Sequence, residues 1–217
     1  MKPLRIALTK GRLEKSMIGL FDRMGWDTSA VADKGRRLIL PVYDRQTGGA
    51  IEVVLAKPAD VLTYVGHGVC ELGVVGKDTI AEAAGDTAGG FYEMLDLGFG
   101  KCRFALAAPK GTDFFGGYTG KTVATKYPHV ARGYFDSRGM DVQIIRIEGS
   151  VELAPLLGLA GGIVDLVETG STLRENGLEV VEEIMPISAR VIVNMACMKL
   201  HKPEIEALIA KMEAQIS

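Results

Sequence analysis

Cysteine and histidine are scarce in this chain of 217 residues, which holds three of each. The cysteines, Cys70, Cys102 and Cys197, lie far apart in apolar surroundings without a Cys-x-x-Cys pair, so we expect buried, reduced thiols. The histidines lack the spacing of metal ligands, which argues against a zinc site. A nucleophile pair of His67 and Cys70 is a further alternative, and it is disfavoured.

Long apolar runs and an excess of either charge are also missing. No apolar stretch approaches the roughly 20 residues that span a bilayer. Lys10 and Arg12 follow the first apolar run too soon for a signal peptide. The formal net charge is −2 without a long basic run, so the electrostatic footprint of a duplex-binding protein is absent. We therefore expect a cytoplasmic protein that binds neither nucleic acid nor membranes and meets anionic ligands through local sites.

The hydrophobic residues that are present alternate between strand and helix periodicity. Strands are predicted at 4–9, 37–42, 51–56, 71–76, 92–98, 103–108, 121–126, 141–147, 161–168, 179–187 and 190–195. Helices are predicted at 13–24, 58–66, 77–84, 129–138, 151–160, 171–176 and from 203 onward. Repeated strand–helix–strand units favour α/β sheets with parallel strands, and their number favours two lobes with a cleft between them. The lobes are expected at 1–94 with 179–217, and at 95–178.

The stretch "IVDLVETGSTL" at 163–173 is the strongest chemical signal. A strand runs into small, hydroxyl-rich residues at the start of a helix, where backbone N–H groups and hydroxyls suit a phosphate monoester. Asp165 and Glu168 border this anion site, and carboxylates suit the donating hydroxyls of a ribose. A 5-phosphoribosyl group would satisfy both features. The alternative is a helix cap at Thr169 or Ser171 beside a buried carboxylate.

A second loop, "EGSVELAP", places Glu152 in the first turn of a helix, where it could reach the same ribose. Two further strand ends carry glycines and cations, in "TKGRL" at 9–13 and "ELGVVGKD" at 71–78. Isolated cations precede or end other strands at Arg36, Arg37 and Lys57. For each of these, an anion site competes with an ordinary turn or a solvated charge.

Taken together, "LTKGRL", "DVLTYVGHGVCELGVVGKD", "ATKYPHVARGYF", "GSVELAPLLGLAGGIVDLVETGSTLRENGLE" and "VIVN" resemble the ATP phosphoribosyltransferase family of histidine biosynthesis. The resemblance runs in the family's order from about residue 4 to 195. It implies a fold like the two-lobed periplasmic binding proteins of type II, with the active site in the cleft between the lobes. It also implies transfer of the phosphoribosyl group of 5-phosphoribosyl 1-pyrophosphate (PRPP) to N1 of ATP, with Mg²⁺ on the phosphates.

The resemblance implies a role for individual residues as well. The lobe at 95–178 would bind PRPP, through Glu152, Asp165, Thr169, Gly170, Ser171 and Thr172. The other lobe would bind ATP and pyrophosphate, through Gly11, Arg12, Gly73 and Gly76. Catalysis would fall to the cations Lys10, Arg36 and Lys57, because adenine N1 already has a lone pair and requires no base. Lys57 departs from the arginine usual in the family, which loses a bidentate contact.

The length resembles the short form of the family, which lacks a histidine-binding regulatory domain. Short forms work with a regulatory subunit that resembles histidyl-tRNA synthetase, so we expect a homodimer within a larger hetero-oligomer. One rival is a type I phosphoribosyltransferase, whose acidic pair is usually adjacent, unlike Asp165 and Glu168. Another is a two-lobed solute-binding protein without catalysis, which the absent export signal and the phosphate-plus-ribose motif disfavour.

Overall fold

The computed structural model describes residues 3–84, 90–117 and 121–216. The chain forms two compact units, Met1–Gly100 with Ser188–Ser217 as the first and Lys101–Ile187 as the second. None of the helices in the described ranges is long and apolar enough to cross a membrane. Each unit is built on its own sheet.

The first unit holds a seven-stranded sheet in the order β2-β3-β4-β1-β5-β12-β6. Its strands are β1 (Leu4–Thr9), β2 (Trp26–Asp27), β3 (Ile39–Asp44), β4 (Ala50–Ala56), β5 (Leu72–Gly76), β6 (Phe91–Asp96) and β12 (Ala189–Asn194). Its helices are α1 (Arg12–Arg23), α2 (Ser29–Ala32), α3 (Pro58–Gly66), α4 (Lys77–Ala83), α8 (Met195–Leu200) and α9 (Lys202–Glu213). The central strands β4, β1 and β5 are parallel, so their carboxyl ends meet at one edge.

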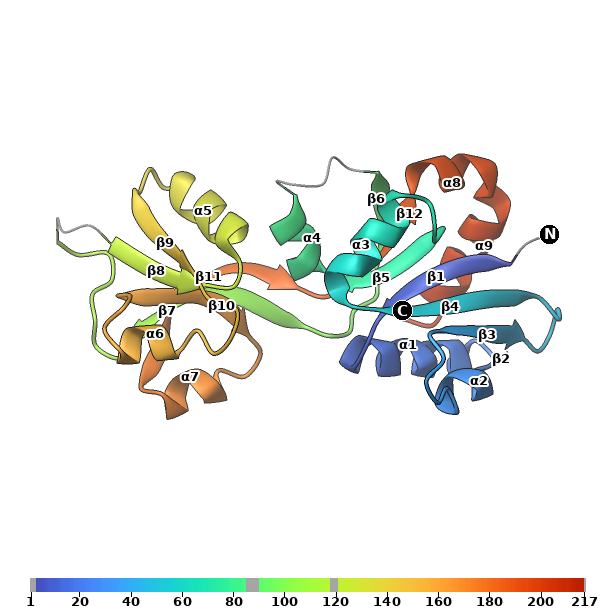
Figure 1. Cartoon of the computed structure of the whole chain (residues 1–217), viewed down its shortest axis with the longest axis horizontal. Coiled ribbons are helices and arrows are strands. Elements are labelled where there is room, and N and C mark those ends of the chain that lie inside the picture. The colour runs from blue at the N-terminus through green and yellow to red at the C-terminus, as the bar shows by residue number, and fades with distance from the viewer. Residues whose placement is uncertain (1–2, 85–89, 118–120, 217) are drawn as a thin grey trace. The chain divides into compact units, whose positions relative to one another are not determined.

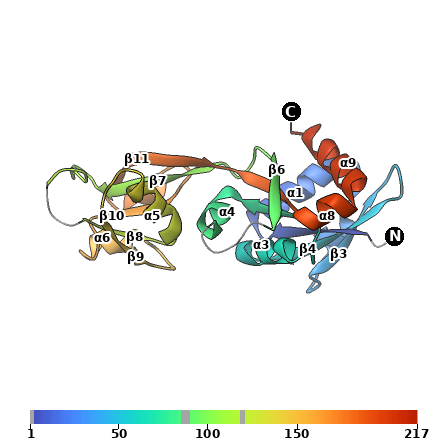
Figure 2. The ribbon, with the colours of Figure 1, turned by 90° about the horizontal axis from the view of Figure 1, so that it is seen from above.

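Two apolar layers hold this sheet. On one face α1 and α9 bury residues at helical spacing, such as Met17 and Phe21 from α1 and Leu208 and Met212 from α9. On the other face α3 packs Val61 and Val65 against the sheet. Figure 2 shows α1 and α9 on one side of the sheet and α3 on the other. Both faces of the central strands are therefore covered, as parallel strands require.

Gly73 in β5 allows α3 to approach the sheet closely. A Cβ added at this position would lie 2.8 Å from side-chain carbons of both Val61 and Val65, and 3.3 Å from Ile192 of β12. Gly73 is buried in the interior of its strand. The residue is therefore required by helix–sheet packing.

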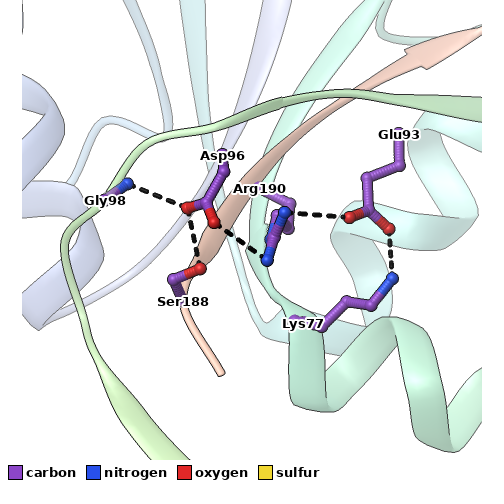
Figure 3. A network of polar contacts seen from close by, with 6 residues as sticks. All are labelled: Lys77, Glu93, Asp96, Gly98, Ser188 and Arg190. Atoms are coloured by element: carbon purple, nitrogen blue, oxygen red, sulfur yellow. Dashed lines mark hydrogen bonds and ion pairs between the residues drawn. The ribbon is translucent and has the colours of Figure 1, made fainter. Parts of the chain in front are cut away.

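An ion-pair network ties β6 to β12 near the points where the chain leaves and re-enters the first unit (Figure 3). Arg190 on β12 bonds Asp96 at 2.9 Å and Glu93 at 3.3 Å, both on β6. Lys77 pairs with Glu93 at 2.5 Å, and Ser188 donates to Asp96 at 2.7 Å. Because all these groups are partly shielded and share partners, the network fixes both strand ends better than an isolated surface pair would.

The second unit holds a five-stranded sheet in the order β11-β7-β10-β8-β9. Its strands are β7 (Cys102–Pro109), β8 (Lys121–Thr125), β9 (Val142–Arg146), β10 (Gly162–Val167) and β11 (Leu178–Ile187). Its helices are α5 (Pro128–Asp136), α6 (Leu153–Leu156) and α7 (Ser171–Glu175). Figure 1 shows α5 on one side of this sheet and α6 with α7 on the other. Strands β10, β8 and β9 are parallel, so their carboxyl ends share one edge.

The unit boundaries fall later than the expected crossings near 94 and 178. Strand β6 pairs along its length with β12 of the first unit, so the first unit extends past 94. Strand β11 pairs with β7 over its whole length, so the second unit extends past 178. Strand pairing, which joins residues far apart in sequence, accounts for both differences.

Most expected elements are present, with local differences. The structure adds β2, α2 and α8, and it shortens the helix expected at 151–160 to the single turn α6. Pro155 and Gly158 lie within the expected helix, and Gly158 has a φ of 71°, which L side chains rarely adopt. Two of the three thiols, Cys70 and Cys197, are buried as expected, and Cys102 is half-buried.

Replacing Gly73 with alanine should destabilise the fold through overpacking rather than weaken a ligand contact. We expect the Gly73→Ala variant to lose about 1–3 kcal/mol of unfolding free energy in urea denaturation. The matched control is Gly19→Ala, in the middle of α1, where the nearest atom to an added Cβ is the end of the Arg23 side chain at 3.9 Å. That variant should be as stable as the parent or more stable by roughly 0.5–1 kcal/mol. Unchanged stability of Gly73→Ala would contradict the packing role.

Candidate active site

The loop after β10 is a pocket wall built from a strand end and a helix start. Gly170 has a φ of 72°, a left-handed conformation that turns the chain from β10 into α7. The pocket has a volume of about 240 Å³. It is lined by all the residues predicted to bind PRPP, namely Glu152, Asp165, Thr169, Gly170, Ser171 and Thr172. The structure thus brings together two segments, around 152 and 165–172, that the sequence had linked to one ligand.

The loop presents donors toward the pocket. The hydroxyls of Thr169 and Ser171 lie 3.1 Å apart. Gly170 occupies the N-cap of α7 and supplies no side-chain cap, whereas the N–H of Ser171, the first residue of the helix, donates weakly to the Thr169 hydroxyl at 3.4 Å. Two guanidinium groups bind the backbone of the loop: Arg103 donates to the carbonyl of Glu168 at 3.2 Å and Arg174 to that of Thr169 at 3.0 Å.

Asp165 is a half-buried carboxylate at the end of β10. Burial, and to a smaller extent the neighbouring charge of Glu152, raise the pKa of its carboxyl to about 6. The backbone N–H of Leu166 and the ammonium of Lys126 act in the opposite direction. The group is therefore ionised at neutral pH, at a cost in folding free energy, and it can accept hydrogen bonds from hydroxyls.

Lys126 is a pocket neighbour that the sequence reasoning missed. It follows Thr125, the last residue of β8, whose partner in the parallel pair with β10 is Val164. Lys126 therefore ends its strand at the level of Asp165. Its position in the sequence could have identified it, because Lys126 follows the last residue of a parallel strand just as Lys10 and Lys57 do.

The three cations predicted to be catalytic lie at one edge of the first unit's sheet. Thr9 of β1 is aligned with Ala56 of β4, so Lys10 and Lys57 leave the sheet side by side, and the Lys10 N–H donates to the Ala56 carbonyl at 3.0 Å. Arg36 precedes β3, which runs antiparallel to β4, and so starts from the same edge. Within the described part of the chain, these three exposed side chains form no ion pair.

The start of α1 supports the same edge. Gly11 is its N-cap with a φ of 98°, and its N–H donates to Glu14, 3.2 Å away. Glu14 is buried and also pairs with Lys34, which ties the turn before β3 to this helix. Arg12 is the first residue of α1. The backbone around Gly11 is thus fixed beside the cationic strand ends.

The glycines of the "ELGVVGKD" motif divide between two roles. Gly76 ends β5 and caps α4, two residues beyond Val74, which is aligned with Leu8 of β1, so it reaches the same edge as Lys10. Gly73 does not reach that edge, because it lies inside the strand against α3. Lys77 forms an ion pair with Glu93, so its charge is neutralised and does not add to the cationic edge of the first unit's sheet.

Two other chemistries lack support. Cys70 is 1% exposed within the apolar layer under α3, whereas His67 is exposed at the end of that helix, so the pair is not arranged to attack a substrate. Among the described residues, no group of three or more His, Cys, Asp and Glu side chains could hold a metal ion. The second unit thus offers a compact pocket lined by hydroxyls and carboxylates, and the first unit offers a cationic edge.

Comparison with known proteins identifies the family. The family model described as ATP phosphoribosyltransferase matches residues 57–214. A relative from Clostridium kluyveri named ATP phosphoribosyltransferase is 56% identical over 216 residues, covering 100% of this chain and 95% of the relative. A relative of the same name from Clostridium acetobutylicum is 52% identical over 212 residues, covering 98% of this chain and 95% of the relative.

Solved structures agree. A chain of the ATP phosphoribosyl transferase (HisG:HisZ) complex from Thermotoga maritima matches with a TM-score of 0.79 and 32% identity, over 98% of each chain. The aliphatic sulphonate binding protein SsuA from Escherichia coli matches with a TM-score of 0.63 at 12% identity, over 99% of this chain and 72% of SsuA. The second likeness shows the fold alone, and it confirms the predicted periplasmic-binding-protein type. On the first likeness, the two close relatives and the family model, the chain belongs to the ATP phosphoribosyltransferase family.

Proposed function

We propose that the protein transfers the 5-phosphoribosyl group of PRPP to N1 of ATP, giving N1-(5-phosphoribosyl)-ATP and pyrophosphate. This is the first step of histidine biosynthesis. The observation that carries the proposal is the pocket at the end of β10 in a member of this family. There a hydroxyl-rich helix start faces two carboxylates, Asp165 and Glu152, as a ligand with a phosphate and a diol requires.

The donor is assigned to the second unit. The loop Thr169–Thr172 binds the 5-phosphate through hydroxyls and the N–H groups at the start of α7. Asp165 and Glu152 accept hydrogen bonds from the two ribose hydroxyls. The pairing explains why acidic residues border an anion site, since each group meets a different part of one ligand.

The acceptor and the leaving group are assigned to the first unit. The N1 lone pair of adenine forms the bond to C1 of the ribose, and the C1–O bond breaks with its electron pair going to pyrophosphate. Lys10, Arg36 and Lys57 stabilise the charge that develops on that leaving group. The backbone at Gly11, Arg12 and Gly76 positions the nucleotide at the same edge. No titrating base is needed.

Mg²⁺ is assigned to the substrate phosphates. The described residues hold no cluster of three or more metal-ligand side chains. Substrate phosphates suit Mg²⁺, because the ion keeps several waters and is commonly bound through phosphate oxygens. When bound, it neutralises pyrophosphate charge, while the chain's own cations orient the leaving group.

The protein is assigned to the short form, acting in the cytoplasm as a homodimer with a regulatory subunit that resembles histidyl-tRNA synthetase. The assignment is supported by relatives of nearly the same length, since the chain covers 95% of each of two of them. It is also supported by the 98% coverage of a chain from a HisG:HisZ complex.

The direct test is an assay with ATP, PRPP and Mg²⁺ in the presence of the regulatory subunit. We expect the ultraviolet absorbance of phosphoribosyl-ATP to appear only when both substrates are present. ATP carrying the phosphoribosyl group on an atom other than N1, or any product formed without PRPP, would point to another reaction. Complete absence of product at high protein concentration would refute the proposed function.

Substitutions in the donor pocket should separate the two substrates. Asp165→Asn and Thr172→Val each remove a hydrogen bond to a charged or polar group of the donor, so KM for PRPP should rise about tenfold or more. KM for ATP should change much less. Asp141→Asn, an exposed position in the same unit, is the matched control. Equal losses for PRPP and ATP would contradict the placement of the donor.

Asp165→Asn should also stabilise the folded protein at neutral pH. The folded pKa of about 6 lies above the unfolded value, so the ionised, half-buried carboxylate costs folding free energy above pH 6. Removing the charge should add stability on the order of 1 kcal/mol at pH 7.5, and the gain should vanish as the pH falls toward 4. Thermal melts at the two pH values measure this, and a gain that is larger at low pH would contradict it.

Histidine should act through the partner. We expect histidine to inhibit the assembled enzyme strongly and the isolated chain weakly, because the binding site is assigned to the regulatory subunit. Initial rates with increasing histidine, with and without the partner, make the comparison. Strong inhibition of the isolated chain at low histidine would overturn the short-form assignment.

A further inference from the structure

Lys126 and Asp165 project from the same face of the second unit's sheet. Ile163 of β10 is aligned with Ala124 of β8, and both lie in the apolar layer under α6 and α7. Because side chains alternate along a strand, residues two positions further, Asp165 and Lys126, point to that face as well. Lys126 directly follows β8 at the level of Asp165 in β10, so a cation and a carboxylate start from neighbouring positions of adjacent parallel strands.

The other charges around Asp165 come from each neighbouring element. Glu152 faces it from the start of α6, and Glu168 lines the pocket from the end of β10. Arg103 on β7 already binds the Glu183 carboxylate at 2.6 Å and the loop carbonyl of Glu168.

On α7, Arg174 is engaged with the loop carbonyl of Thr169. Lys126 is exposed and forms no ion pair within the described ranges, so its ammonium group can follow the charge of the pocket. It is the cation that acts on the Asp165 carboxylate.

We propose that Lys126 is a positioning residue for the phosphoribosyl donor, which keeps the Asp165 carboxylate ionised beside Glu152 so that it accepts a ribose hydroxyl. The donor in this statement rests on the proposed function, whereas the charge coupling between Lys126 and Asp165 does not. Two neighbouring carboxylates repel each other, and half-burial weakens the screening between them. A cation on a flexible stem beside the pair offsets that repulsion through its charge.

The charge coupling between Lys126 and Asp165 can be measured without enzymatic activity. Titration of the Asp165 side-chain carboxyl by ¹³C NMR in the unliganded protein should give a midpoint that moves to higher pH in Lys126→Met. Lys126→Arg keeps the charge and should restore the midpoint. Lys110→Met is the matched control, because Lys110 is an exposed lysine of the same unit that follows β7 at the opposite end of the sheet from Asp165. An unmoved midpoint in Lys126→Met would overturn the proposal.

The positioning role has a second, kinetic readout in the assembled enzyme. At pH 6, KM for PRPP should be about three- to tenfold higher in Lys126→Met than in the parent, and the difference should shrink at pH 8, where Asp165 ionises in both. KM for ATP should stay constant, and Lys126→Arg should recover most of the loss. A KM increase of equal size at both pH values would mean that Lys126 contacts the donor directly, and would overturn the positioning role. If the parent itself forms no product, the proposed function fails, while the NMR titration still decides the coupling.

Discussion

Parallel alignment of neighbouring strands is the constraint on which the candidate site of each unit depends. In the first unit, alignment of Thr9 with Ala56 sets Lys10 beside Lys57. In the second, alignment of Val164 with Thr125 sets Asp165 at the level of the next residue of β8. A slip of one residue would turn every side chain of a strand to the other face. The buried apolar residues on both faces oppose such a slip, so the hydrophobic core fixes the chemistry at the strand ends.

Electrostatics then distinguishes the candidate site of the first unit from that of the second. The first unit collects cations at its edge, which suits pyrophosphate and nucleotide phosphates. The second unit keeps a half-buried carboxylate, Asp165, against a second one, Glu152, although this arrangement opposes its ionisation. Packing alone gives no reason for such a pair, since a neutral side chain would be less costly there. A local arrangement that costs stability is expected where ligand binding requires it.

Local patterns predicted much of this architecture, and tertiary pairing accounts for the rest. The transition from strand to loop at Thr169–Thr172 is predictable from the sequence, because strand periodicity, turn residues and the helix start follow one another directly. The sequence does not predict that β11 belongs to the second sheet, because that depends on pairing with β7, about 75 residues earlier in the chain. The pairing aligns Leu178 with Pro109 and Ile187 with Cys102. The sequence alone does not show that Gly73 is needed for packing, because the close approach of α3 to β5 is evident only in the folded structure.

The distribution of arginine and lysine in the donor pocket follows from the different shapes of their side chains. Arg103 and Arg174 use planar guanidinium groups to bind the carbonyls of Glu168 and Thr169. With those carbonyls engaged, the loop is held with its donors turned toward the pocket before any ligand arrives. Preorganisation of this kind reduces the entropy lost on binding. The exposed ammonium of Lys126 instead acts on the Asp165 carboxylate through its charge alone.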